Sequence, residues 1–287
     1  MQIREVFDRK RFVFLDGGMG TQLQARGLQP GQKPELAALE MPEVLTAIHT
    51  DYANAGADIL LANTFGANAK KLTGCGHTVE EVVSASIACA RKAAETTGAC
   101  VALDIGPLGE LLVPAGTLAF EDAYNEFAQI IRAGAAAGAD LVFLETMTDL
   151  YELKAAILAA RENCDLPVFT SMSFESRGRT FTGCTVESYA VTAAGLGADA
   201  VGINCSSGPD QMGSVVRMMH RAAGDTPIAA KPNAGLPTIT ETGEAVYSMG
   251  PEAFVRHMQA LKASGAALLG GCCGTTPEFI AAMRSLK

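Results

Sequence analysis

The chain has 287 residues, of which 48% are hydrophobic and 18% are charged, and its net charge is −9. It has no cluster of Lys and Arg that would follow a phosphate backbone, so nucleic acid is excluded as a partner. No apolar run approaches the roughly 18 residues of a membrane-spanning helix, and residues 1–11 lack the apolar stretch of a signal peptide. We therefore expect a cytoplasmic protein with a large core and no membrane partner.

Eight short apolar segments are predicted to be strands, with helical sequence between successive ones. In chain order they are FVFLDG from Phe12, AGADILLANTF from Ala55, CVALDIG from Cys100, AGADLVFLET from Ala137, PVFTSMSF from Pro167, LGADAVGINC from Leu196, PIAAKPNAG from Pro227 and SGAALLGGCC from Ser264. In four of these segments the second residue is a glycine that suits a helix C-cap, namely Gly56, Gly138, Gly197 and Gly265.

A strand followed by a helix, repeated eight times, predicts an α/β fold of the (β/α)8 TIM barrel type. An open doubly wound sheet is the alternative, but eight nearly even units favour closure. The chain shows no linker or composition shift that would divide it. We therefore interpret residues 1–287 as one barrel domain.

Polar residues stand at the C-terminal end of each predicted strand, where barrels of this class carry their active sites. The strand ends read Asp16-Gly17-Gly18, Asn63-Thr64-Phe65, Asp104-Ile105-Gly106-Pro107, Glu145-Thr146, Ser171-Met172-Ser173, Asn204-Cys205-Ser206, Lys231-Pro232-Asn233 and Cys272-Cys273-Gly274. Random placement would not put a polar group at every strand end. The pattern predicts an active site at this mouth of the barrel.

Three of the eight cysteines lie at two of these strand ends: Cys205, Cys272 and Cys273. Adjacent strand residues point to opposite faces, so Cys272 and Cys273 reach one ion only if the backbone bends, which the glycines around them permit. A vicinal disulfide is the strained alternative. The remaining cysteines, Cys75, Cys89, Cys100, Cys164 and Cys184, are interpreted as buried small side chains.

Three thiolates with an open fourth position are typical of a zinc site that performs chemistry. Coordination deprotonates a thiol that would otherwise be mostly protonated at neutral pH. A fourth thiolate, supplied by a substrate, would make the net charge of the complex more negative, about −2. That charge keeps the sulfur nucleophilic, so the site predicts a thiol that attacks an activated carbon.

The residues that carry this chemistry resemble the homocysteine S-methyltransferase family, and most closely the homocysteine-binding module of cobalamin-dependent methionine synthases. The resemblance covers the whole chain in order. Its motifs are LDGGMGTQL at Leu15, ADILLANTFGAN at Ala57, DIGPLGE at Asp104, FLETMTDLYELKAA at Phe143, GINCSSGP at Gly202, KPNAGLP at Lys231 and GGCCGTTPE at Gly270. The family is a zinc-dependent (β/α)8 barrel, which agrees with the fold predicted above.

The resemblance implies a role for each matching residue. Cys205, Cys272 and Cys273 are the expected zinc ligands and catalytic residues. Asp16 and Glu145 are expected to bind the amino group of homocysteine, where both carboxyls should stay ionised. Backbone N–H groups around Gly17, Gly18 and Thr146 are expected to bind its carboxylate. Asn233 is the remaining expected substrate-binding residue. Asn233 either fills the fourth zinc position when substrate is absent or is a turn residue beside Gly235.

The resemblance leaves the methyl donor open between methylcobalamin, S-methylmethionine and betaine. The GGCCGTTPE and DIGPLGE segments look most like the cobalamin-dependent enzyme, yet the chain carries no cobalamin-binding signature. We therefore expect methylcobalamin to arrive on a corrinoid protein or a partner domain. Whether the chain is a free-standing protein or a module stays open. A non-catalytic zinc or thiol-sensing barrel is the alternative from a different class.

Overall fold

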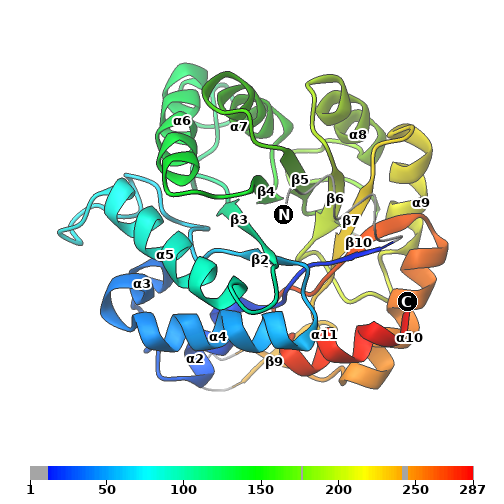
Figure 1. Cartoon of the computed structure of the whole chain (residues 1–287). Coiled ribbons are helices and arrows are strands. Elements are labelled where there is room, and N and C mark those ends of the chain that lie inside the picture. Colours follow the sequence, from blue (N-terminus) through cyan, green and yellow to red (C-terminus); the bar gives the residue numbers. More distant parts are fainter. Residues whose placement is uncertain (1–11, 176, 241–244, 287) are drawn as a thin grey trace.

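The computed structural model describes residues 12–175, 177–240 and 245–286, and eight parallel strands form its centre (Figure 1). The strands are β1 Val13–Phe14, β2 Ile59–Leu61, β3 Cys100–Ile105, β4 Leu141–Met147, β5 Val168–Met172, β6 Val201–Asn204, β7 Ile228–Lys231 and β10 Ala266–Leu269. Their order in the sheet is β1-β10-β7-β6-β5-β4-β3-β2, and a parallel bridge between Leu15 and Ile59 joins the first strand to the last. The predicted (β/α)8 barrel is confirmed.

Helices surround the barrel and connect each strand to the next (Figure 1). They are α2 Met19–Ala25, α3 Ala37–Glu40, α4 Pro42–Ala55, α5 Val79–Ala94, α6 Phe120–Ala136, α7 Leu150–Asn163, α8 Val186–Gly195, α9 Gly213–Ala222, α10 Pro251–Ala263 and α11 Pro277–Met283, with 3-10 turns at Pro34–Leu36 and Arg284–Leu286. The four predicted cap glycines, Gly56, Gly138, Gly197 and Gly265, all adopt positive φ, between 89° and 112°. Glycine tolerates this conformation without the steric penalty of a Cβ.

Two apolar layers hold the barrel together. The larger layer lies between the sheet and the helices, and includes Phe14, Leu60, Val101 and Val142 from the strands. The smaller fills the interior of the barrel with Val13, Leu15, Ile59, Leu61, Cys100, Ala102, Leu141, Phe143, Phe169, Ala200, Ala229 and Leu268. Strand residues alternate between the layers because successive side chains point to opposite faces.

Two features of the structure go beyond the predicted elements. An antiparallel ribbon of β8 Pro237–Ile239 and β9 Ala245–Tyr247 is inserted between β7 and α10. Its exposed residues lack the buried apolar run that marks the barrel strands. Residues 1–11, expected to contain no signal peptide, lie outside the described residues, so the extent of the domain stays a prediction. In the described part of the chain, no helix is both long and apolar enough to cross a membrane.

Candidate metal centre and substrate cavity

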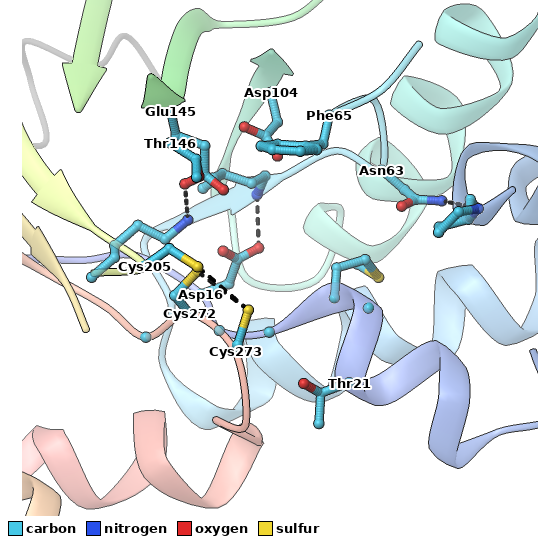
Figure 2. A pocket seen from close by; sticks show the side chains of 18 of the residues that line it. Asp16, Thr21, Asn63, Phe65, Asp104, Glu145, Thr146, Cys205, Cys272 and Cys273 are labelled. Carbon is cyan, nitrogen blue, oxygen red and sulfur yellow. Dashed lines mark hydrogen bonds and ion pairs between the residues drawn. The ribbon is translucent and has the colours of Figure 1, made fainter. Parts of the chain in front are cut away.

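Three thiols meet at the C-terminal mouth of the barrel (Figure 2). The sulfur of Cys273 lies 3.6 Å from that of Cys205 and 4.0 Å from that of Cys272, and all three lie within 4.8 Å of one another. Tetrahedral zinc with Zn–S bonds of about 2.3 Å separates its sulfurs by about 3.8 Å. All three cysteines are free, so the vicinal disulfide is not formed. The spacing fits one ion bound by three thiolates.

The backbone at two strand ends aims these thiols at one point. Cys205 directly follows β6 and has a φ of 52°, a conformation that non-glycine residues seldom adopt. Cys272 and Cys273 lie beyond the end of β10, in a turn whose Gly274 has a φ of 78°. Gly271 is required for a different reason, since a Cβ there would lie 2.3 Å from the Thr275 hydroxyl. The expected backbone bend is present, and close packing accounts for part of the glycine content.

The thiols share protons unevenly because they are close together. Hydrogen bonds from the Cys205 and Cys272 thiols lower the pKa of Cys273 to about 3. Hydrogen bonds to its two neighbours, together with burial, raise the pKa of Cys205 far above its ordinary value. A cluster that already favours one thiolate beside two thiols is chemically suited to a soft divalent cation.

A cavity of about 320 Å³ opens beside the thiols. Its lining comes from seven strand ends and the loop that follows β1, and includes Asp16, Gly17, Gly18, Met19, Glu35, Asn63, Phe65, Asp104, Glu145, Thr146, Cys205, Lys231, Cys272 and Cys273. Thiols and carboxyls therefore face one space that a small amino acid would fill. No histidine in the described ranges lines this cavity, which leaves no imidazole base beside the thiols.

The cavity contains buried charges of both signs. The Lys231 ammonium forms an ion pair of 2.6 Å with Glu145, and both side chains are almost fully buried. The Phe143 ring lies below the same ammonium, 5.3 Å away. Burial by itself lowers the pKa of Lys231, but the charges of Glu145, Asp16 and Asp104 raise it overall. Lys231 is therefore a permanent cation, and the sequence patterns assigned it no role.

Two carboxyl oxygens in the cavity have no hydrogen-bond partner within the described residues: Oδ1 of Asp16 and Oδ1 of Asp104. The other oxygen of Asp16 accepts a hydrogen bond of 2.7 Å from the Leu61 N–H. Burial raises the pKa of Asp16 to about 7 and also raises that of Glu145. Among the described residues that line the cavity, Lys231 is the one cation beside these carboxyls, so their ionisation next to a substrate ammonium stays a prediction.

The strand end at Glu145 and Thr146 departs from regular geometry. The pairing of β4 with β5 shifts register between Leu144 and Met147, and Thr146 has a φ of 60°. Such a bulge re-aims side chains, and both Glu145 and Thr146 line the cavity as a result. A β-branched residue in this conformation is strained, so neighbouring groups must hold it there.

Asn204 is the group that holds Thr146. Its amide oxygen accepts from the Thr146 N–H at 2.8 Å and from the Ser171 hydroxyl at 2.7 Å. Its amide nitrogen donates to the Thr146 hydroxyl at 2.7 Å and to the Cys272 sulfur at 3.9 Å. The fully buried amide thereby links the strained strand end to one of the three thiols. A strand-end Asn next to Cys205 was the available sequence signal, and it received no role.

The same contacts revise which backbone N–H groups are free for a substrate. The Thr146 N–H donates to Asn204, and the Gly18 N–H donates to the Thr275 hydroxyl at 3.1 Å. Gly17 and Gly18 are required by packing, since a Cβ on Gly17 would lie 2.7 Å from that hydroxyl and a Cβ on Gly18 2.8 Å from the Cys272 carbonyl oxygen. The expectation that Thr146 and Gly18 offer free N–H groups to a carboxylate is therefore wrong.

Asn233 shows features of both roles that its sequence allowed. Its carbonyl oxygen accepts from the Gly235 N–H at 2.7 Å, as a turn residue would. Its side-chain oxygen is buried without a partner in the described part of the chain. The next residue, Ala234, donates its N–H to the Cys273 carbonyl oxygen at 2.9 Å, so the turn lies against the thiol loop. Asn233 is not among the residues that line the cavity, so its part as a fourth metal ligand stays a prediction.

Tyr247 of the ribbon covers the other side of the thiol loop. A Cβ on Gly274 would lie 2.3 Å from its ring, so the glycine is needed for this contact. The Tyr247 phenol hydrogen-bonds to Cys273, and burial together with the charge of Cys273 raises the pKa of the phenol. The inserted ribbon therefore adds a hydrogen-bonding group to the centre, which no apolar pattern in the sequence indicated.

The fold and the site together define a (β/α)8 barrel with a three-thiol centre and an acidic cavity at its C-terminal mouth. The chain belongs to the homocysteine S-methyltransferase family, whose sequence profile matches residues 13–286. It is 34% identical over 306 residues to a methionine synthase of Mycobacterium tuberculosis and 33% identical over 294 residues to that of Mycobacterium leprae. These matches cover 97% and 94% of the chain, but only 25% and 24% of the length of the two relatives.

Solved structures support the fold. The homocysteine methyltransferase MmuM of Escherichia coli matches over 99% of both chains at 24% identity, with TM-scores of 0.85 for its oxidised form and 0.83 for its metallated form. The described barrel therefore has the architecture of that protein, and the resemblance stated from the motifs is confirmed at the level of family and fold.

Proposed function

We propose that this chain is a zinc-dependent methyltransferase that methylates homocysteine at sulfur to give methionine. The observation that carries the proposal is the convergence of Cys205, Cys272 and Cys273 beside a cavity that also holds buried carboxyls. The family membership and the metallated form of the Escherichia coli structure support it. When bound, a zinc ion at these thiols converts a coordinating substrate thiol into a thiolate at neutral pH.

The cavity suits both ends of homocysteine. Its thiol would lie toward the cysteines, at the fourth zinc position that we propose for the Asn233 amide oxygen when substrate is absent. Its ammonium would lie toward the acidic group of Asp16 and Glu145, where a cation offsets the burial of charge. Its carboxylate would approach the glycine-rich loop at Gly17, since the N–H groups of Gly18 and Thr146 already donate within the protein.

After the thiol has lost its proton, methyl transfer forms one sulfur–carbon bond and breaks the bond between the methyl group and its donor. The substrate sulfur gives up its proton to solvent, attacks the methyl carbon of the donor, and the donor keeps the electron pair of the broken bond. The protein orients the sulfur, excludes water from the buried half of the cavity and places the ammonium so that the sulfur faces the barrel mouth. No histidine among the described residues lines the cavity, and a thiol bound to the metal would lose its proton without a side-chain base.

We propose methylcobalamin on a separate corrinoid protein or partner domain as the donor. The likeness to methionine synthases supports this choice, as does the short match to them, which leaves about three quarters of each relative unaccounted for by this chain. S-methylmethionine and betaine remain the competing donors, and the first is compatible with the likeness to a free-standing homocysteine methyltransferase. The proposed place of action is the cytoplasm.

The test is a donor comparison on the zinc-loaded chain. Methylcobalamin, S-methylmethionine and betaine are each offered with homocysteine, and methionine is quantified alongside zinc per chain. The proposal predicts one zinc per chain and methionine formed fastest with methylcobalamin. Methionine formed only from S-methylmethionine or betaine would reassign the donor. Zinc binding with no methionine from any donor and no binding of homocysteine would favour the thiol-sensing barrel.

A further inference from the structure

The DIGPLGE segment contains a buried carboxyl that the proposed function leaves without a task. Asp104 lies near the end of β3, two residues beyond Ala102, which belongs to the apolar filling of the barrel interior. Because side chains on one face of a strand recur every second residue, Asp104 continues that inward row. It lines the cavity together with Asp16 and Glu145, and Figure 2 shows its side chain beside Phe65.

The surrounding chain fixes Asp104 on both sides. The Thr64 hydroxyl accepts from the Asp104 N–H at 3.1 Å and donates to the Asp104 carbonyl oxygen at 2.7 Å. Two residues further on, Gly106 packs directly against the Phe65 ring, which a Cβ would approach to 2.4 Å. The ring thereby closes the cavity next to the carboxyl. The segment is built to present this one acid in a fixed position away from water.

The buried cation is already committed to another partner. Lys231 forms its ion pair of 2.6 Å with Glu145, whereas Asp16 and Asp104 each keep an oxygen, Oδ1, without a hydrogen-bond partner in the described residues. A buried carboxyl oxygen without a partner is unfavourable unless a ligand or water supplies a donor. An ammonium group offers three donors and one positive charge, which suits two carboxyl oxygens that have no hydrogen-bond partner among the described residues.

We propose that Asp104 is a further substrate-specificity residue, which binds the ammonium group of the amino-acid substrate beside Asp16 and Glu145. The inference rests on the proposed function because it assumes a homocysteine-like thiol in the cavity. It adds a third acid to the two that the proposed function names for the ammonium. Burial and the charge of Glu145 raise the pKa of Asp104, as expected where a cationic ligand has yet to bind.

The test compares two thiols that differ in one group. Homocysteine carries the ammonium, and 4-mercaptobutanoate has the same chain and carboxylate without it. Calorimetric titration of both into the zinc-loaded wild type and into Asp104→Asn gives the dissociation constants, and zinc content and thermal melting report the integrity of each protein. Glu152→Gln is the matched control, because Glu152 is buried and carries a raised pKa but does not line the cavity.

We expect Asp104→Asn to weaken homocysteine binding about 10- to 100-fold, the range for losing a hydrogen bond to a charged group. Binding of 4-mercaptobutanoate and zinc content should stay within about threefold of the wild type. Should the asparagine variant fail to fold, Asp104→Ser replaces it. Unchanged homocysteine binding, or an equal loss for both thiols, would overturn the inference and leave the proposed function standing. A wild type that binds neither thiol would overturn both.

Discussion

The lower and upper halves of the barrel interior differ sharply in chemistry, although the same strands build both. The lower half is apolar, with Ala102, Phe143, Phe169 and Ala229 among its residues. Two positions further along the same four strands stand Asp104, Glu145, Ser171 and Lys231, all buried. One alternation therefore runs through both halves. The comparison indicates that the lower half of the interior contributes mainly to stability, whereas the upper half carries the chemically reactive groups, although the same strands build both halves.

The largest expected effect separates a thiol of the upper half from one of the lower half. Cys272→Ala removes one of three ligands, so zinc content should fall well below one per chain and methyl transfer should fall at least about 100-fold. Cys100→Ala changes a buried thiol of the lower half and should keep both zinc and activity. Metal analysis and methionine formation measure the two variants side by side. A Cys272 variant with full zinc content would end the proposed assignment.

The second prediction reverses the comparison by damaging the lower half. Phe169 is fully buried and packs edge to face on Phe143, with ring centroids 6.1 Å apart. Phe169→Ala should lower the free energy of unfolding by about 3–5 kcal/mol because it leaves a cavity in a closely packed interior. Denaturant unfolding measures the loss. The folded fraction should still bind one zinc per chain, and a specific loss of zinc would show that the two halves are not separable.

The third prediction concerns the amide that links the two strand ends of the upper half. Asn204→Ala removes the two hydrogen bonds from Asn204 to Thr146 and the donor to Cys272. Activity should fall about 10- to 100-fold, as for other groups that orient metal ligands.

Ser171→Ala is the matched control for Asn204, because it removes a single donor to the same amide oxygen and should cost much less. Cobalt substituted for zinc gives an absorption band from the thiolates, and this band should shift in Asn204→Ala while it stays unchanged in Ser171→Ala. Identical spectra and activities for both variants would show that the amide does not position Cys272.

The smallest effect arises outside the barrel interior. His49 in α4 is fully buried, neither ring nitrogen has a partner among the described residues, and burial lowers its pKa from 6.5 to about 4. The folded state therefore binds fewer protons than the unfolded state between pH 6.5 and pH 4, so stability falls as the pH falls through this window. At pH 5 the expected loss relative to pH 7 is about 2 kcal/mol.

A difference between two proteins isolates the contribution of His49. The buried carboxyls Asp16 and Glu152, whose raised pKa values act with the opposite sign, titrate equally in wild type and His49→Leu. The free energy of unfolding is measured for both proteins at pH 7 and pH 5. The value for His49→Leu minus the value for the wild type should be about 2 kcal/mol larger at pH 5 than at pH 7. Parallel pH curves would show that His49 is not buried as a neutral group.

The sequence predicted the barrel well because its signals are local. Apolar runs, glycine caps and the polar strand ends each depend on a few neighbouring residues, and the eight strands and four caps follow from them. The three thiols were identified because cysteine pairs at strand ends are rare. Their convergence at sulfur separations of 3.6 and 4.0 Å depended on closure of the barrel, which the local pattern only implied.

Roles that arise from contacts between distant strands were not predictable. The pairing of Lys231 with Glu145 joins residues 86 positions apart, and it places a cation against an acid that was assigned to substrate. The link from Asn204 to Thr146 spans 58 positions and occupies an N–H group that was assigned to substrate. The ribbon that carries Tyr247 was missed because its strands are exposed and lack an apolar run.

The most direct test of the central claim is X-ray absorption at the zinc edge, with and without homocysteine. The account predicts three sulfur ligands and one oxygen or nitrogen ligand in the free protein, in keeping with Asn233 as the fourth group. Homocysteine should raise the count to four sulfurs at about 2.3 Å. A sulfur count that stays the same when homocysteine binds would contradict the claim that the three thiols serve to activate the thiol of the substrate.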